Sequence, residues 1–387
     1  FLPGVTNPNT VLFPGPSLSQ SETFVGGVSD STYGVAAMKL NIQNTTARKA
    51  WFLFDKELVA LGTGINSTNT NEINTTINQT GLNANSLIVN GNSISKGVYK
   101  YDSLNWILND SIAYIFPEKK TIVLKAQTQS GSWYNINNSQ PQTVFSKDVF
   151  TLYFPHGKTP VNASYQYAVV PSISPTEAAN YYKNIPFLVL KNTSQIQAVN
   201  YPGIGVTGIV FYEPGTVAIN GSLSVSVNRS CILLVKKVSN NKYSVTIADP
   251  ERTQAQIVCT LYNKNNIGNS YTFKMPSGDN SGKSVSATID LPIISNVEYV
   301  DKDSLELDIY PQPSNGVFNV SFFTDHSSDL IIYIFDNLGK MVYMESLRNY
   351  TGNYHKVINL SEQPSGLYIM KIRVGERFKT YKLCIEK

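Results

Sequence analysis

Short apolar runs separated by turn residues recur along almost the whole chain. Residues 35–42 alternate apolar and polar side chains, which is typical of a strand with one buried face. Residues 50–54 form a continuous apolar run, as expected of a strand that is buried on both faces. Residues 55–62 read as a tight turn and the return strand of a hairpin. This pattern predicts an all-β protein.

The composition agrees with this prediction and excludes several classes of protein. With 23 Tyr, 25 Gly, 19 Pro and only 15% charged residues, the chain is suited to strands and turns, which excludes a helical bundle or a coiled coil. Apolar runs stop short of the roughly 20 residues that span a bilayer, so we expect no membrane span. The net charge of +4 is too small to argue for a nucleic-acid partner. Three His and three Cys leave little material for a metal or thiol active site.

The start of the chain and its cysteines add two expectations. Residues 1–4 contain no Met, and no basic or apolar region of a signal peptide follows, so we expect a piece cut from a longer protein. Cys231 and Cys259 lie in strand-like apolar runs. We therefore expect both side chains to be small buried hydrophobes. A bridge between them stays open, because their spacing alone does not support one.

Most of the chain reads as strands, with one helical segment among them. Residues 175–183 have helical character, with Ser174 as the cap and Glu177 three residues after it. A second set of strands follows from residue 185, and residues 295–304 read as a linker. Residues 305–387 have turns of their own and predict a separate small sandwich of about seven strands.

Several stretches resemble, in order, the β-domains of polysaccharide lyase family 8, which includes chondroitin AC, hyaluronate and xanthan lyases. The longest is residues 47–65 (ARKAWFLFDKELVALGTGI), and the match covers roughly residues 1–270 with a pattern that is similar to the chondroitin AC type. The other stretches are 2–6 (LPGVT), 24–30 (FVGGVSD), 33–35 (YGV), 74–79 (NTTINQ), 156–160 (HGKTP), 165–167 (YQY), 197–199 (QAV) and 248–250 (ADP).

The last segment resembles a different family, the C-terminal sorting domain of type IX secretion, which is found in Bacteroidetes. Residues 309–316 (IYPQPSNG), 334–340 (IFDNLGK) and 364–368 (PSGLY) carry this resemblance. Gln312 stands where the family usually has Asn between the two prolines. The resemblance implies export by the type IX machinery through residues 305–387. It also implies a protein that is secreted from a Gram-negative bacterium or held at its surface.

Together the two resemblances imply the fold and its division into domains. Residues 1–184 are expected to form a large antiparallel β-sandwich (a supersandwich) that is truncated at its N-terminus. Residues 185–294 are expected to form a smaller β-sandwich. Residues 305–387, after the linker, are expected to form an immunoglobulin-like β-sandwich.

The lyase resemblance also implies a reaction, the breakage of a glycosidic bond at a uronic acid by β-elimination. The C5 proton becomes acidic only when the neighbouring carboxylate is neutralised, and the step then needs a base for this proton and an acid for the leaving C4 oxygen. In the family an Asn neutralises the carboxylate, while His, Tyr and Arg transfer protons and orient the substrate, all on an upstream α/α-toroid domain. We therefore assign no catalytic residue in this chain and expect it to be inactive alone, with no cofactor required.

Four residues are candidates for contact with an acidic, glycosaminoglycan-like polysaccharide. Trp51 offers an aromatic face to a sugar, and Arg48 and Lys49 lie close to it in the sequence and could face an acidic polymer, although a core position for Trp51 is the alternative. Asn78 and Gln79 would line the cleft that faces the toroid, or else pair across strands. Trp106 and Trp133 read as core or surface-strand aromatics.

The remaining candidate ligands are few. His156 reads as a structural or hydrogen-bonding side chain, and His326 and His355 as solvent-exposed; their spacing does not suit a metal. Glu22, Asp30 and the carbonyl of Tyr33 form a candidate structural calcium site, because oxygen ligands on a loop suit that ion, the alternative being ordinary turn residues.

The leading hypothesis is thus the β-domain portion of a secreted lyase that cleaves chondroitin- or hyaluronan-like glycans. The alternative is a non-catalytic secreted glycan-binding or surface β-sandwich protein. A third interpretation, a spacer for export, fits only residues 305–387.

Overall fold

The computed structural model describes residues 1–387 except 10–21, 83–86, 292–306 and 376. The chain divides into two compact units, residues 1–293 and 294–387, which we describe separately. The expected boundary between residues 184 and 185 falls inside the first unit, and it stays a prediction. The expected linker, 295–304, lies outside the described residues.

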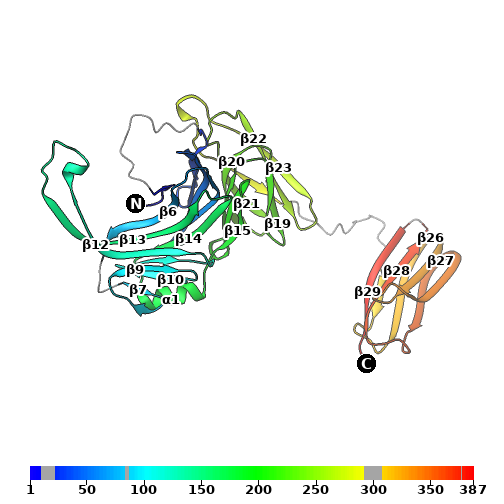
Figure 1. Ribbon diagram of the computed structural model, residues 1–387. Helices are drawn as coiled ribbons and strands as arrows, with labels where there is room; N and C mark the ends of the chain where they lie inside the picture. The colour runs from blue at the N-terminus through cyan, green and yellow to red at the C-terminus, as the bar shows by residue number, and fades with distance from the viewer. Residues whose placement is uncertain (10–21, 83–86, 292–306, 376) are drawn as a thin grey trace. The chain divides into compact units, whose positions relative to one another are not determined.

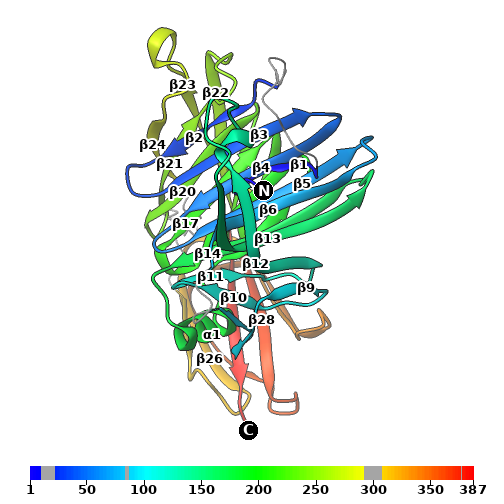
Figure 2. The same ribbon diagram turned by 60° about the vertical axis from the view of Figure 1, so that its left-hand side comes forward.

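Two sheets of the first unit face each other across one core (Figures 1 and 2). Neighbouring strands pair antiparallel, as β4 does with β5. Sheet A has the order β1-β6-β13-β12-β9: Thr6–Pro8, Glu72–Gly81, Val144–Lys158, Ile122–Ser132 and Gly97–Tyr101. Sheet B has the order β2-β3-β4-β5-β14-β11-β10-β7-β8: Val25–Ser29, Gly34–Ile42, Thr45–Leu53, Leu58–Ser67, Ala163–Pro171, Ile112–Ile115, Trp106–Asn109, Ile88–Val89 and Asn92–Ser93.

The other two sheets of this unit form the second sandwich. Sheet C has the order β15-β16-β17-β20-β21-β24: Leu188–Asn192, Ile196–Tyr201, Val206–Phe211, Cys231–Ser239, Lys242–Ala248 and Val285–Asp290. Sheet D has the order β18-β19-β22-β23: Gly215–Asn220, Leu223–Val227, Gln256–Asn263 and Gly268–Lys274. Short 3₁₀ turns lie at Trp133–Asn135 (η1), Pro202–Ile204 (η2) and Gly278–Asn280 (η3).

Three apolar cores show that the sheets stack in the order A, B, C, D. One core joins sheets A and B through residues such as Ala47 and Phe154. A second joins sheets B and C through Phe52 and Val210, and a third joins C and D through Phe211. Sheet B therefore buries both of its faces, which is why β4 contains the continuous apolar run of the sequence.

The helix and the hairpin predicted from the sequence are confirmed. Helix α1 spans Pro175–Lys183, and Ser174 and Glu177 form a capping box in which each side chain accepts a hydrogen bond from the other's backbone N–H. Ala178 on this helix is buried in the core between sheets B and C. Strands β4 and β5 form the hairpin whose turn lies at residues 54–57.

The second unit is a β-sandwich with its own core. Its strands are β25 (Leu307–Tyr310), β26 (Val317–Phe335), β27 (Met341–Asn359), β28 (Gly366–Val374) and β29 (Arg377–Ile385). The prediction of about seven strands was wrong for the described residues. Strands β26 and β27 each run for 19 residues and change register near Thr324 and Ser328, so each long, irregular strand takes the place of two shorter ones.

Two further expectations from the sequence concern the buried cysteines and the membrane span. Cys231 and Cys259 are free and fully buried in the core between sheets C and D, which confirms them as small buried hydrophobes. Burial raises the pKa of the Cys259 thiol to about 12, so this thiol is unreactive at neutral pH. No helix in the described part of the chain has the length and apolarity to cross a membrane.

Candidate functional site

Trp51 and Lys49 lie on one face of β4, and Arg48 lies on the other. Successive side chains of a strand point to opposite faces. Ala47 and Trp51 pack in the core toward sheet A, whereas Phe52 packs in the core toward sheet C. Lys49 shares the face of Trp51 and places its Nζ atom 5.4 Å from the centre of the indole ring. Trp51 is half-buried, so one part of its ring packs in the core and the other part is accessible.

Polar side chains from three strands of sheet A gather near Lys49. The Thr75 hydroxyl on β6 forms hydrogen bonds with the Thr6 hydroxyl on β1, at 2.7 Å, and with Nε2 of His156 on β13, at 2.8 Å. The Lys49 ammonium donates to the carbonyl oxygen of Gly4, in the turn before β1. These residues, with Trp51, define what we call the Lys49 cluster: Gly4, Thr6, Lys49, Trp51, Thr75 and His156.

Burial controls the charges of the Lys49 cluster. Lys49 is only 2% exposed, and burial lowers its pKa to about 7. Burial, reinforced by the positive charges of Lys49 and Lys120, lowers the pKa of His156 to about 4. At neutral pH His156 is therefore uncharged and bonded to Thr75, as the sequence predicted for a structural histidine. The cluster accordingly offers an aromatic face and a partly charged lysine beside it.

Arg48 lies between sheets B and C, away from Trp51. Its guanidinium carbon is 5.8 Å from the centre of the Tyr212 ring, and its Nε atom is buried without a hydrogen-bond partner. The hydroxyl of Tyr212 lies 2.8 Å from Oε1 of Gln197 and 3.1 Å from the carbonyl oxygen of Lys49. The structure therefore does not bring Arg48 and Trp51 together on one surface.

Asn78 and Gln79 are consecutive residues of β6 and point to opposite faces of sheet A. The Asn78 amide donates to the hydroxyl of Tyr114, which lies in the core between sheets A and B. Oε1 of Gln79 accepts a hydrogen bond from the Thr151 hydroxyl at 3.2 Å. Gln79 thus makes a cross-strand contact, Asn78 bonds across the core to sheet B, and both amides are half-buried.

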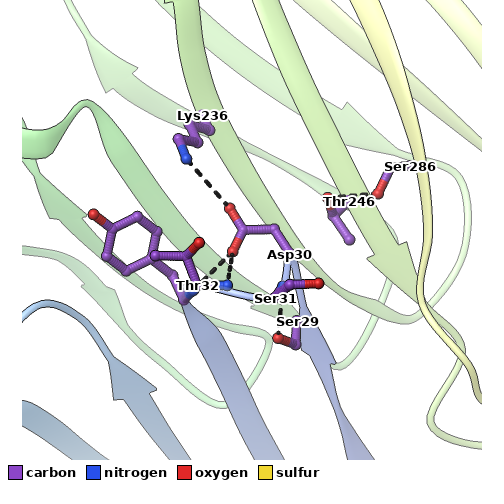
Figure 3. A network of polar contacts seen from close by, with 8 residues as sticks. Ser29, Asp30, Ser31, Thr32, Lys236, Thr246 and Ser286 are labelled. Carbon is purple, nitrogen blue, oxygen red and sulfur yellow. Dashed lines mark hydrogen bonds and ion pairs between the residues drawn. The ribbon is translucent and has the colours of Figure 1, made fainter.

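The loop proposed for calcium holds a lysine instead of an open set of oxygens (Figure 3). Oδ1 of Asp30 accepts the backbone N–H groups of Thr32 and Tyr33, and Oδ2 lies 3.8 Å from the Lys236 ammonium. The Tyr33 carbonyl already accepts the Asp30 N–H at 3.2 Å. These oxygens do not fit a calcium ion, which needs six to eight free oxygen ligands. The calcium site, with Glu22, stays a prediction that this geometry does not favour.

The two remaining tryptophans and the two remaining histidines can each be compared with the position predicted from the sequence. Trp106 is 4% exposed and belongs to the core between sheets B and C, as predicted. Trp133 is 60% exposed and lies in the 3₁₀ turn η1, so it is neither a core nor a strand residue. His355 is exposed on β27, as predicted. The side chain of His326 lies outside the described residues.

Sequence reasoning grouped Lys49 and Arg48 with Trp51 by proximity alone and missed Thr6 and Thr75 as parts of the cluster. The alternation of β4 was the available signal, because it places Lys49 on the face of Trp51 and Arg48 on the opposite face. No local signal joins Thr6 to Thr75, which are 69 residues apart and meet only because β1 pairs with β6.

Family models match three segments of the chain. Residues 1–182 match the super-sandwich domain of polysaccharide lyase family 8, and residues 188–258 match the C-terminal beta-sandwich domain of the same family. Residues 308–386 match the secretion system C-terminal sorting domain. The layered fold and these matches define the class of protein, the β-domains of a polysaccharide lyase followed by a sorting domain.

The chain belongs to polysaccharide lyase family 8. It is 38% identical over 244 residues to chondroitinase-AC of Pedobacter heparinus, a match that covers 62% of this chain and 34% of that protein. It is 30% identical over 271 residues to hyaluronate lyase of Thermasporomyces composti, covering 67% of this chain and 34% of that protein. The structure of a chondroitinase AC lyase, solved with oligosaccharides, superposes with a TM-score of 0.70 at 33% identity, covering 74% of this chain and 43% of the other. The chain thus spans about a third of the length of these curated relatives.

Proposed function

We propose that residues 1–293 hold an acidic, uronic-acid-containing polysaccharide during cleavage by β-elimination. The observation that carries the proposal is the membership of family 8, together with a half-buried tryptophan beside a lysine in the Lys49 cluster. An indole stacks on the apolar face of a sugar ring, and the partial positive charge of the buried Lys49 nearby attracts the carboxylate of a uronic acid without touching it. The substrate class is chondroitin- or hyaluronan-like.

The groups that move protons in the elimination belong, in this proposal, to an α/α-toroid domain of the whole protein. The titratable groups of the Lys49 cluster do not suit that task. His156 is bonded to Thr75 and has a pKa near 4, and the Lys49 ammonium is bonded to the Gly4 carbonyl and inaccessible. A general base must reach the proton that it removes.

We further propose export through the type IX secretion system, with residues 308–386 as the segment that the machinery reads. The match to a sorting domain supports this, and the protein would then be released or held at the cell surface. Fractionation of producing cells tests it, because a protein without residues 308–386 should stay inside the cell. Unchanged export of that truncated protein would contradict the proposal.

Replacing Trp51 by alanine should weaken binding of hyaluronan or chondroitin by about tenfold, because a stacking surface is lost. Trp51→Phe keeps an aromatic ring and should retain most of the affinity. Isothermal titration with each polysaccharide measures the effect, and thermal unfolding checks that the fold is intact. Trp106→Phe, a change to a tryptophan in another core, is the matched control and should bind like the wild type. Equal affinity of Trp51→Ala and the wild type would remove Trp51 from the site.

A further inference from the structure

Strands β12 and β13 extend beyond sheet A as a free ribbon that carries large apolar side chains at its tip. Strand β12 pairs with β9 only over residues 122–126, and β13 pairs with β6 only from Val149 onward. Residues 127–148, which we call the arm, therefore pair with each other, except at the base, where Gln127 pairs with Val149 and the Asp148 carbonyl accepts the N–H of Leu82. Figure 1 shows this ribbon reaching away from the sheets.

The arm is ordered by its own hydrogen bonds. At its base, Asp148 accepts the Thr128 hydroxyl at 2.6 Å and lies 2.5 Å from the ammonium of Lys96. Along the ribbon the hydroxyls of Ser130 and Ser146 lie 2.7 Å apart. A two-stranded ribbon without such support is only marginally stable in water. These contacts hold the tip in place without any apolar core.

The tip is a compact turn with a defined conformation. The backbone N–H groups of Ile136 and Asn137 both donate to the Trp133 carbonyl, at 3.0 and 2.9 Å. Oδ1 of Asn137 accepts the backbone N–H and the hydroxyl of Ser139. These bonds fix the backbone of the turn that carries Trp133, which lowers the entropy lost when a ligand binds.

Four large apolar side chains of the arm are exposed, and none belongs to the described cores. Trp133 is 60% exposed, Ile136 74%, Val144 67% and Phe145 54%. Leaving large apolar side chains in water is unfavourable, and their concentration on one short ribbon marks a binding surface. As consecutive strand residues, Val144 and Phe145 expose their side chains on opposite faces of this ribbon. Trp133 and Ile136 lie in one turn, and Val144 pairs with Ser132 beside it.

The chemistry around these side chains favours a carbohydrate over other partners. Residues 126–146 contain no charged side chain, and the tip carries five amides, at Asn135, Asn137, Asn138, Gln140 and Gln142. Amides donate and accept hydrogen bonds at once, which suits the hydroxyl and acetamido groups of sugars. In the hydrocarbon of a membrane the same amides would lose their hydrogen bonds, which is costly.

We propose that the arm is a second polysaccharide-binding site, in which Trp133 stacks on a sugar ring and the surrounding amides bind its hydroxyl groups. This inference rests on the proposed function and adds a site to it, apart from the Lys49 cluster. Because residues 126–146 carry no charge, the tip binds the neutral face of the hexosamine units rather than the carboxylates. Its contribution to affinity is therefore insensitive to salt.

Titration of hyaluronan into the full chain tests the arm. We expect Trp133→Ala to weaken binding about tenfold and by the same factor at low and high salt. Trp133→Phe should retain most of the affinity. Val161→Ala, which changes an 85% exposed side chain outside the arm, is the matched control and should bind like the wild type. N-acetylchitohexaose, a neutral hexosamine chain, should compete with hyaluronan at the arm in the wild type and not in Trp133→Ala.

Three results would overturn the inference. The first is equal hyaluronan affinity of Trp133→Ala and the wild type while Trp51→Ala loses affinity, which leaves the proposed function standing. The second is a wild type that binds neither hyaluronan nor chondroitin, in which case the proposed function fails as well. The third is binding to phosphatidylglycerol vesicles that depends on Trp133, which would assign the arm to membranes.

Discussion

Replacing Phe52 by alanine should lower the free energy of unfolding of residues 1–293 by about 3–5 kcal/mol. Phe52 is fully buried in the core that joins sheets B and C. This core is the one that attaches the second sandwich to the first, so a cavity at this position weakens that attachment. Loss of apolar contact and the remaining void both contribute to the cost.

Gly208 on β17 contacts Phe52 across the same core and allows a second variant that tests this prediction. A Cβ atom at Gly208 would lie 2.6 Å from Cγ2 of Val35 and 2.7 Å from Cδ1 of Phe52, so the two sheets approach here only because residue 208 is glycine. Gly208→Ala alone should destabilise the unit by about 1–3 kcal/mol through this overlap. In the double variant the added methyl group enters the space that Phe52→Ala leaves.

The double variant should therefore be less destabilised than the sum of the single variants, by about 1 kcal/mol. Tryptophan fluorescence during urea unfolding measures this for the first unit alone, because all three tryptophans, Trp51, Trp106 and Trp133, lie in it. Leu53→Ala, which changes a 44% exposed residue next in the chain, is the control and should cost less than about 1 kcal/mol. Strict additivity of Phe52→Ala and Gly208→Ala would show that the two positions do not share this contact.

The stability of the first unit should fall as the pH is lowered, because two bases of the Lys49 cluster, the buried Lys49 and the half-buried His156, have lowered pKa values. His156 has a pKa of about 4 in the folded protein against 6.5 for an ordinary histidine. Between these two pH values the unfolded chain binds a proton that the folded protein does not, so acid favours unfolding. The loss from pH 7 to pH 4 should be about 2–3 kcal/mol.

Lys49 acts in the same direction at higher pH. Its pKa is about 7 in the folded protein against 10.5 for an ordinary lysine, so stability should rise as the pH increases through this range. His156→Gln, which keeps a hydrogen-bonding group for Thr75, should remove the acid loss below pH 6.5. Lys49→Met should remove the rise above pH 7.

Unfolding midpoints in urea across pH 4 to 10 measure both effects. Lys158→Met, a change to an exposed lysine on the same strand as His156, is the control for the loss of one charge and should keep the wild-type profile. A wild-type profile that is flat from pH 7 to pH 4, or a His156→Gln profile that still falls there, would contradict the burial of an uncharged histidine.

Local patterns in the sequence were enough to predict the strands, the capped helix and the hydrogen-bonding role of His156. The continuous apolar run of β4 predicted burial on both faces, and Ser174 with Glu177 predicted the capping box, since both depend on neighbours in the sequence. The resemblance to family 8, rather than any local pattern, supplied the supersandwich. Packing sheet B between sheets A and C depends on contacts between distant strands, such as Phe52 with Gly208.

The candidate site was harder to predict, because it depends on which face of a strand each side chain occupies. Arg48 was grouped with Trp51 on proximity in the sequence, yet β4 points them to opposite faces. Trp133 read as a core or strand aromatic, whereas the turn that exposes it is formed by long-range pairing of β12 with β13. Strands β26 and β27 likewise continue through register shifts, where a larger number of shorter strands was predicted.

The central claim is that this chain holds the polysaccharide but does not supply the elimination chemistry. Mixing residues 1–387 with hyaluronan or chondroitin and recording ultraviolet absorbance tests it, because elimination at a uronic acid creates a carbon–carbon double bond that absorbs. We predict binding by titration calorimetry with no rise in absorbance. Accumulation of unsaturated products by this chain alone, or failure to bind either polysaccharide, would contradict the claim.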